Sequence, residues 1–217
     1  LNNEINYVYW FVYMLIGLYL ISPILSKWLN NCKNIQIEYF LLIWIFSLIT
    51  NLFPFLDTAF NLNYFAGYIG YFVLGYYLSI KKIDRTNSLR LSIFFIILGS
   101  LLTIIGNYFF EVISFKSYLT PNIMILSTGV FLLAKNFNLP KNTIIRKVIL
   151  QISKFSFSIY LIHVVFISIL YRVFGINCLF ISPYIGSLLI CIIVIVCSLL
   201  FLELFRRLPF TKYISGL

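Results

Sequence analysis

Residues 183–202, PYIGSLLICIIVIVCSLLFL, form a run of twenty residues without a charged side chain. A helix of this length is about 30 Å long, which matches the hydrocarbon core of a bilayer. Ser182 followed by Pro183 is a typical helix start, because a capping side chain precedes a residue with a fixed φ. The sequence therefore predicts a membrane-spanning helix over residues 183–205.

Six other stretches are apolar and long enough to cross a membrane. They lie at residues 7–28, 37–55, 64–80, 91–110, 119–134 and 155–174. The chain of 217 residues is 62% hydrophobic and 10% charged, whereas a soluble domain has about 25% charged residues. So few polar groups could not cover the surface in water. We predict an all-α, polytopic transmembrane helical bundle of about seven spans, with residues 1–217 forming a single integral membrane domain.

Basic residues fall in alternate connections between these segments. Fourteen of the sixteen lysines and arginines lie on one side, and Lys116 and Arg172 lie on the other. This positive-inside pattern places the amino terminus of the chain outside, with Trp10 near the outer interface, and its carboxyl terminus in the cytoplasm. In a soluble protein a net charge of +10 would suggest nucleic acid, but here the expected partner is the lipid bilayer. Binding to anionic lipid headgroups alone would also explain the basic loops.

Small residues crowd into the segment at 64–80, which contains Ala66, Gly67, Gly70 and Gly75. Small side chains let helix backbones approach closely in lipid. We therefore expect close helix packing around this segment.

No metal site or bound cofactor is expected from the sequence. Four cysteines and one histidine lack the spacing of a zinc site. The phosphate-binding loop, the serine-hydrolase elbow and the H-E-x-x-H zinc motif are also absent from the sequence. ATP-driven transport, serine hydrolysis and zinc proteolysis therefore lose support.

His163 is the only histidine and lies about 12 Å into the segment at 155–174. Ser156, Tyr160 and His163 are spaced by four and three residues, so they share one helix face. A polar stripe in lipid faces other helices or a cavity. The stripe is interpreted either as an acid/base or hydrogen-bonding group for a substrate, or as a neutral histidine tied to a neighbouring helix.

Two further polar residues on the outer side are candidates for substrate binding. Glu111 ends the segment at 91–110, and Asn63 lies in the connection after residue 55. Each is also explained by a solvated helix end or by ordinary loop composition. Glu203 and Arg207, four residues apart at the inner end, are interpreted as an ordinary helix ion pair.

Three stretches together resemble the acyltransferase 3 family of bacterial membrane acyltransferases. The first is Trp10-Phe11 followed by LIGLYLISPIL at residues 15–25. The second is GYIGYFVLGYYL at residues 67–78, and the third is SIYLIH at residues 158–163. Each is weak alone because Leu, Tyr and Gly are common in membrane helices, but their order and spacing make the resemblance specific.

The resemblance implies a fold of roughly ten helices with both ends in the cytoplasm. It implies an enzyme that moves an acyl group, usually acetyl from acetyl-CoA as co-substrate, to a hydroxyl of a surface glycan or its lipid-linked precursor. If this chain holds the last seven spans, three precede it, and three spans from a cytoplasmic start emerge outside. The family's presumed catalytic histidine and arginines lie in those helices, and Val8 stands where the family often has another histidine.

Our leading hypothesis is the carboxyl-terminal part of a membrane O-acyltransferase for surface polysaccharide. His163 is the expected catalytic residue, with Ser156, Tyr160, Glu111 and Asn63 binding substrate and the basic loops binding the phosphates of acyl-CoA. A multi-pass transporter or lipid-carrier flippase is the alternative from another class. A third possibility is an inactive truncated remnant or an accessory subunit.

Overall fold

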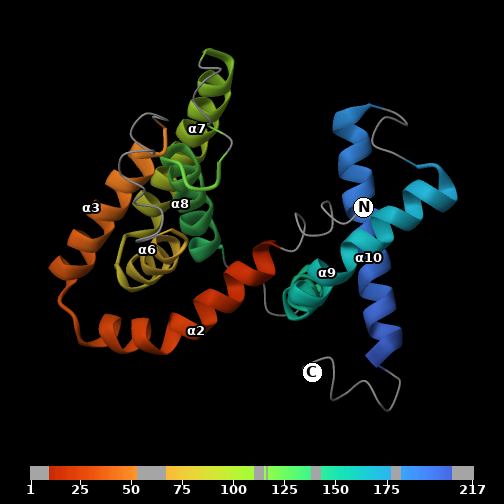
Figure 1. Cartoon of the computed structure of the whole chain (residues 1–217), viewed down its shortest axis with the longest axis horizontal. Helices are drawn as coiled ribbons and strands as arrows, with labels where there is room; N and C mark the ends of the chain where they lie inside the picture. Colours follow the sequence, from red (N-terminus) through yellow and green to blue (C-terminus); the bar gives the residue numbers. More distant parts are fainter. Residues whose placement is uncertain are drawn as a thin grey trace. The chain divides into compact units, whose positions relative to one another are not determined.

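A computed structural model describes residues 10–52, 67–109, 115, 117–137, 143–176 and 182–206. These residues form seven α-helices, and no strand occurs among them. The helices are α2 (Trp10–Asn31), α3 (Asn34–Thr50), α6 (Ile69–Ile80), α7 (Arg85–Phe109), α8 (Pro121–Asn136), α9 (Ile144–Phe174) and α10 (Pro183–Arg206) (Figure 1). Each helix falls on one of the seven apolar segments that the sequence predicts, so the all-α prediction is confirmed.

Four of these helices are long and apolar enough to cross a membrane by length and composition, namely α2, α7, α9 and α10. The other three are shorter: α3 has 17 residues, α8 has 16 and α6 has 12. A 12-residue helix is about 18 Å long, against about 30 Å of hydrocarbon. The prediction of about seven full spans is therefore confirmed only in part, within the residues that the structure describes.

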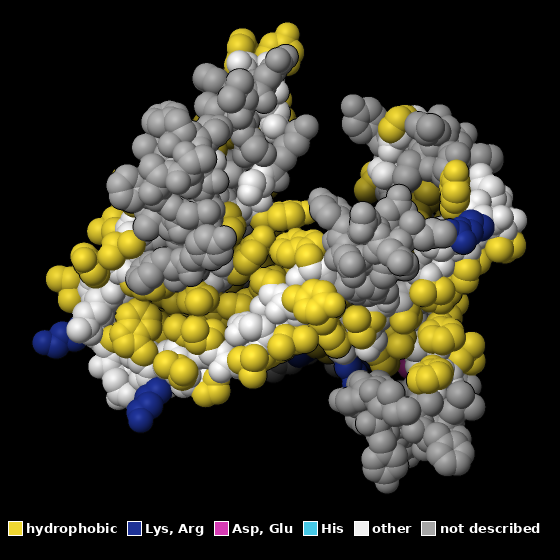
Figure 2. Space-filling view, in the orientation of Figure 1, with side chains coloured by type: hydrophobic (Ala, Val, Ile, Leu, Met, Phe, Trp, Pro, Cys, Tyr) yellow, Lys and Arg dark blue, Asp and Glu magenta, His cyan; other side chains and the backbone are white. Residues whose placement is uncertain are grey.

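The chain divides into two compact units, Leu1–Asn138 and Leu139–Leu217. Unit 1 contains α2, α3, α6, α7 and α8, and unit 2 contains α9 and α10. Hydrophobic side chains cover most of the described surface visible in Figure 2, with lysines and arginines at a few points. A surface of this kind is what a protein in contact with lipid presents. The single integral membrane domain predicted over residues 1–217 stays a prediction.

Trp44 is the centre of the apolar core of unit 1. Its indole is fully buried, lies edge-on to Tyr71 with ring centroids 4.9 Å apart, and donates a hydrogen bond from Nε1 to the Gly67 carbonyl at 2.9 Å. Gly70 packs directly on the indole, where a Cβ atom would overlap the ring. The close packing expected around residues 64–80 is therefore confirmed at Gly70, whereas open space surrounds Gly75.

Helices α7 and α8 of unit 1 pack closely against each other through glycines. A Cβ atom on Gly99 would lie 2.7 Å from the backbone nitrogen of Leu126. A Cβ atom on Gly129 would lie 2.8 Å from the Ser92 carbonyl oxygen. A non-bonded Cβ atom essentially never comes this close to another heavy atom, so the two glycines set how closely the backbones approach.

Hydrogen bonds join the helices of unit 1 at two opposite ends. At one end, which we call the lysine-rich end, Lys135 Nζ donates to the carbonyls of Leu78, Ser79 and Lys81 at 2.8, 3.0 and 3.0 Å. At the other end, Asn51 Nδ2 donates to the Leu119 carbonyl at 2.8 Å. The end of α6 thus meets the end of α8, while the end of α3 meets the start of α8. The orientation that the loop charges predict across a membrane stays a prediction.

In unit 2, α9 begins at Ile144 after Thr143, whose hydroxyl accepts a hydrogen bond from the Arg146 amide at 3.4 Å. The helix starts eleven residues before the predicted span at 155–174, because a capped amphipathic stretch continues into it. It ends at Gly175, which has φ of 66° and closes the helix in the left-handed conformation. Phe166 of α9 contacts Phe201 of α10 edge-on, with centroids 6.0 Å apart.

Candidate functional site

His163 lies on α9 and contacts Tyr160 of the same helix. The side chain is half-buried. Its Nδ1 hydrogen-bonds to the Tyr160 carbonyl one turn earlier. The two rings lie with centroids 5.2 Å apart and planes tilted by 36°. The predicted common face is therefore present for Tyr160 and His163.

The contact of His163 Nδ1 with the Tyr160 carbonyl favours one of the two neutral tautomers of the ring. A carbonyl oxygen only accepts hydrogen bonds, so a hydrogen bond at this place requires the tautomer with its hydrogen on Nδ1. In the neutral imidazole the other nitrogen, Nε2, then keeps its lone pair. The helix thus presents a histidine whose outer nitrogen can accept a hydrogen bond or a proton.

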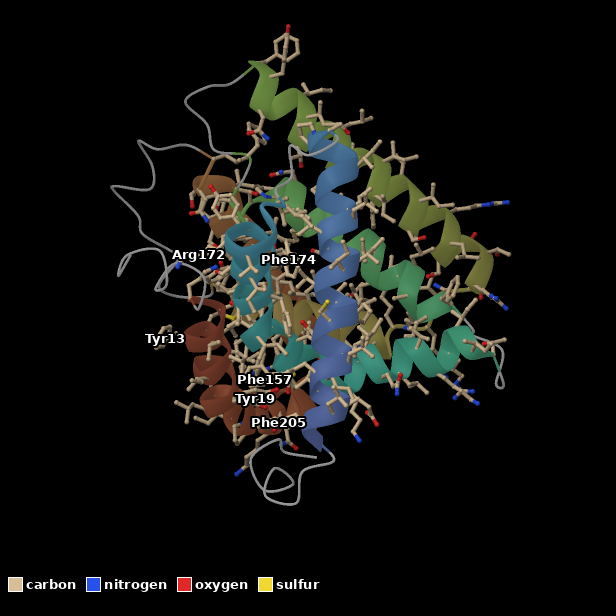
Figure 3. The ribbon with its side chains drawn as sticks, turned by 90° about the vertical axis from the view of Figure 1, so that its right-hand side faces the viewer. Tyr13, Tyr19, Phe157, Arg172, Phe174 and Phe205 are labelled. Carbon is tan, nitrogen blue, oxygen red and sulfur yellow. The ribbon has the colours of Figure 1, made fainter. Side chains whose placement is uncertain are left out.

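Ser156 belongs to the same predicted stripe but lies in a different setting. Its side chain is exposed, whereas Tyr160 and His163 are half-buried. Figure 3 shows that α9 changes direction, so that its amino-terminal part runs away from the arm that ends at Arg172 and Phe174. Tyr160 and His163 are therefore in contact and half-buried, whereas the Ser156 side chain is exposed.

The neighbouring helix α10 contributes a group that sequence reasoning missed. Ser198 is fully buried, and its hydroxyl has no hydrogen-bond partner within the described part of the chain. Its only signal in the sequence is a serine inside an apolar run, which is also typical of helix packing. Glu203 is half-buried on α10. Arg207, its predicted ion-pair partner, lies outside the described residues.

The two substrate-binding candidates from the outer connections, Glu111 and Asn63, also lie outside the described residues. Their predicted roles stay predictions.

An aromatic cluster stands at the end of unit 1 opposite the lysine-rich end. Trp10 stacks on Tyr118 with centroids 5.4 Å apart and planes 25° apart, and it lies 5.7 Å from Tyr68. Tyr118 is 59% exposed, and its backbone carbonyl accepts a hydrogen bond from Tyr71 at 2.7 Å. The sequence predicts only Trp10 at the outer interface, and it could not show that residues 58 and 108 positions away would join it.

Cations and a shallow groove occupy the lysine-rich end of unit 1. Lys81 Nζ donates to the Tyr77 oxygen at 2.7 Å, and the Tyr77 hydroxyl donates to Glu38 at 2.6 Å. The hydrogen bond to Tyr77 is the main cause that raises the pKa of the Lys81 ammonium above 10.5. On α2, a groove of about 510 Å³ is lined by Pro23, Ile24, Lys27, Trp28 and Asn31. This end therefore offers positive charge beside an apolar and aromatic surface.

Comparison with known protein families matches residues 1–203 of the chain to an acyltransferase domain, that of the acyltransferase 3 family. Searches of curated proteins and of solved structures gave no significant match. The matched range includes His163, the aromatic cluster of Trp10, Tyr68 and Tyr118, and the lysine-rich end of unit 1. It also contains all three stretches that carry the resemblance seen in the sequence. The chain belongs to the acyltransferase 3 family.

Proposed function

We propose that the protein transfers an acyl group, most simply acetyl, from acyl-CoA to a hydroxyl of a cell-surface polysaccharide or its lipid-linked precursor. The single observation that carries this proposal is the hydrogen bond of His163 to the Tyr160 carbonyl, in a chain that belongs to an acyltransferase family. Its Nδ1 is occupied by the hydrogen bond to the Tyr160 carbonyl, so Nε2 is the nitrogen that can meet a substrate hydroxyl.

In the proposed reaction, His163 Nε2 accepts the proton of the acceptor hydroxyl as its oxygen attacks the thioester carbonyl carbon. The new C–O bond forms the ester, and the C–S bond breaks. The imidazolium then returns the proton to the departing CoA thiolate. A histidine suits both steps because its ordinary pKa lies near neutral pH.

The donor and the acceptor would approach opposite ends of the spans. The cations and the groove on α2 at the lysine-rich end support a site for the phosphates and apolar arm of acyl-CoA. The aromatic cluster at the other end of unit 1 supports a surface on which sugar rings could lie, with Glu111 and Asn63 as candidate hydroxyl-binding groups. Ser156 and Tyr160 on α9 are proposed as further substrate-binding residues. The positive-inside pattern of the loops supports a location in the bacterial plasma membrane with the carboxyl terminus and the donor in the cytoplasm.

The test uses the full-length gene product in membrane vesicles, with acetyl-CoA labelled in the acetyl group. Transfer of label to glycan is measured for His163→Ala, His163→Gln and Val165→Ala at matched membrane abundance. If His163 accepts the proton, both His163 variants lose about 10²-fold or more in rate. Val165→Ala, which alters an exposed side chain on the same helix, should retain the wild-type rate.

Three other outcomes would contradict the proposal in different ways. Restoration of activity by His163→Gln would make His163 a hydrogen-bonding anchor instead of a base. Movement of glycan across the vesicle membrane without an acyl donor would favour a flippase. Absence of label transfer by the wild-type protein would favour an inactive remnant or an accessory subunit.

A further inference from the structure

The first twelve residues of α9, at positions 144–155, have two chemically different faces. At 100° per residue, six apolar side chains fall within an arc of about 140°. They are Ile144, Ile145, Val148, Ile149, Ile152 and Phe155. The opposite arc holds Arg146, Lys147, Gln151, Ser153 and Lys154, with Leu150 as its one apolar member. We call this stretch the amphipathic segment.

The apolar face of the amphipathic segment is largely uncovered. Ile144 is 80% exposed and Ile145 is 63% exposed, and Val148 and Ile149 are also exposed. Only Phe155, at its end, is buried. Apolar side chains arranged on one face of a helix need an apolar partner, which a bilayer supplies at its interface.

The length of α9 shows that the amphipathic segment is not needed to cross the membrane. The helix has 31 residues, and the 20 residues at 155–174 already measure about 30 Å. The remaining eleven residues would extend a straight span by about 16 Å into water. Instead, α9 changes direction, as Figures 1 and 3 show, so the amino-terminal part is not a continuation of the spanning arm.

The charge of the polar face identifies the surface that the segment fits. It carries three cations and no acidic residue. Lysine and arginine side chains near an anionic leaflet are attracted to its headgroup phosphates. The long stems of Lys147 and Lys154 can lie along the interface while their ammonium groups reach the phosphates.

We propose that residues 144–155 form an in-plane helix docked on the anionic phospholipid surface of the membrane. Its apolar face enters the acyl boundary, and its cations bind the headgroup phosphates. The segment would fix the height at which the spanning arm, and with it His163, sits in the bilayer. This placement does not depend on the proposed acyl transfer.

Site-directed spin labelling of the full-length protein in nanodiscs tests the orientation. Single cysteines at positions 144–155, in a cysteine-free background that elutes as folded protein, carry a nitroxide. Collisions with oxygen and with a water-soluble nickel chelate report depth. An in-plane helix gives a 3.6-residue period, with Ile145 and Ile152 at equal depth. Two different results would overturn the proposal: Ile152 about 10 Å deeper than Ile145, as in a spanning helix, or an apolar face protected from both reagents, as in protein packing.

The headgroup contact is tested by changing the lipid charge. A nitroxide at Ile149 should lie deeper in nanodiscs of phosphatidylcholine with phosphatidylglycerol than in phosphatidylcholine alone. The double variant Lys147→Gln/Lys154→Gln should lose this difference. The matched control Lys27→Gln/Lys82→Gln removes the same charge outside α9 and should keep it. Equal depth in both lipids for the unaltered protein, or a difference that survives in the double variant, would overturn the proposal.

Discussion

The hydrogen bonds of polar side chains differ between the two units of the chain. In unit 1 such groups bond across helices: Trp44 donates to the Gly67 carbonyl, and Asn122 Nδ2 donates to Thr103 at 2.8 Å. In unit 2 the hydrogen bond of His163 stays within α9, and the Ser198 hydroxyl has no partner among the described residues. The hydrogen bonds of Trp44 and Asn122 therefore help to hold the helices of unit 1 together, although Asn122 Oδ1 has no partner among the described residues. The hydrogen bond of His163 does not join α9 to α10.

Among the variants that test this contrast, Trp44→Ala in unit 1 has the largest expected effect on stability. It removes a fully buried indole and its hydrogen bond, so we expect a loss of about 3 kcal/mol or more in the free energy of unfolding. Thermal unfolding in detergent, followed by size-exclusion chromatography, measures the loss. Tyr19→Ala is the matched control because Tyr19 is an exposed aromatic residue on α2. Equal losses from the two variants would show that Trp44 is not the centre of a core.

Glycine substitutions sharpen the comparison between packed and open helix surfaces. Gly99→Ala forces a Cβ atom against the backbone of α8, and we expect a loss of about 1–3 kcal/mol. Gly75→Ala and Gly17→Ala add a Cβ atom where open space surrounds it, so each should gain about 0.5–1 kcal/mol in helix propensity. Unfolding midpoints in one detergent measure all three. A gain for Gly99→Ala would contradict the glycine contact between α7 and α8.

A third comparison uses two variants, each of which removes one buried polar side chain from one of the two units. Asn122→Ala removes hydrogen bonds to Thr103 and to the Phe115 carbonyl, and we expect a loss of about 1–2 kcal/mol. Ser198→Ala removes a buried hydroxyl without a described partner and should leave stability unchanged or raise it. Equal destabilisation by both, in the same unfolding assay, would mean that Ser198 contributes to helix packing as much as Asn122 does.

The smallest expected effect belongs to Tyr77→Phe at the lysine-rich end. The Lys81 ammonium is exposed, so its bond to Tyr77 contributes about a few tenths of a kcal/mol. The bond raises the pKa of folded Lys81. Its contribution is therefore fully present below 10.5, the unperturbed value, and is lost as pH rises through the raised pKa. Unfolding midpoints of both proteins between pH 8 and alkaline pH measure it; a difference that grows with pH would reverse the sign.

The sequence predicts the positions of the helices well because hydrophobic run length is a local property. All seven segments contain a helix, and the shared face of Tyr160 and His163 follows from the helical period. The predicted start of α9 is too late, because hydropathy marks only the membrane span and not the capped stretch before it. The family is also predicted correctly, because its three motifs are contiguous in the chain.

The features that the sequence does not predict depend on contacts between residues far apart in the chain. The stacking of Trp10 on Tyr118 and the capping of α6 by Lys135 arise only when helices pack. The tautomer of His163 depends on the distance from its ring to a backbone carbonyl, which spacing alone does not give. Period and composition contain no information on these pairings, since many faces of an apolar helix are equivalent in sequence.

The glycine contact between α7 and α8 has a consequence for how the chain enters the membrane. Alone, α8 would expose Asn122 to hydrocarbon, and it is not among the four helices apolar and long enough to span by themselves. Beside α7, Asn122 finds Thr103 and is almost fully buried. The two helices are thus suited to leave the insertion channel together as a hairpin, with α7, which is long and apolar enough to span, carrying its shorter partner into the bilayer.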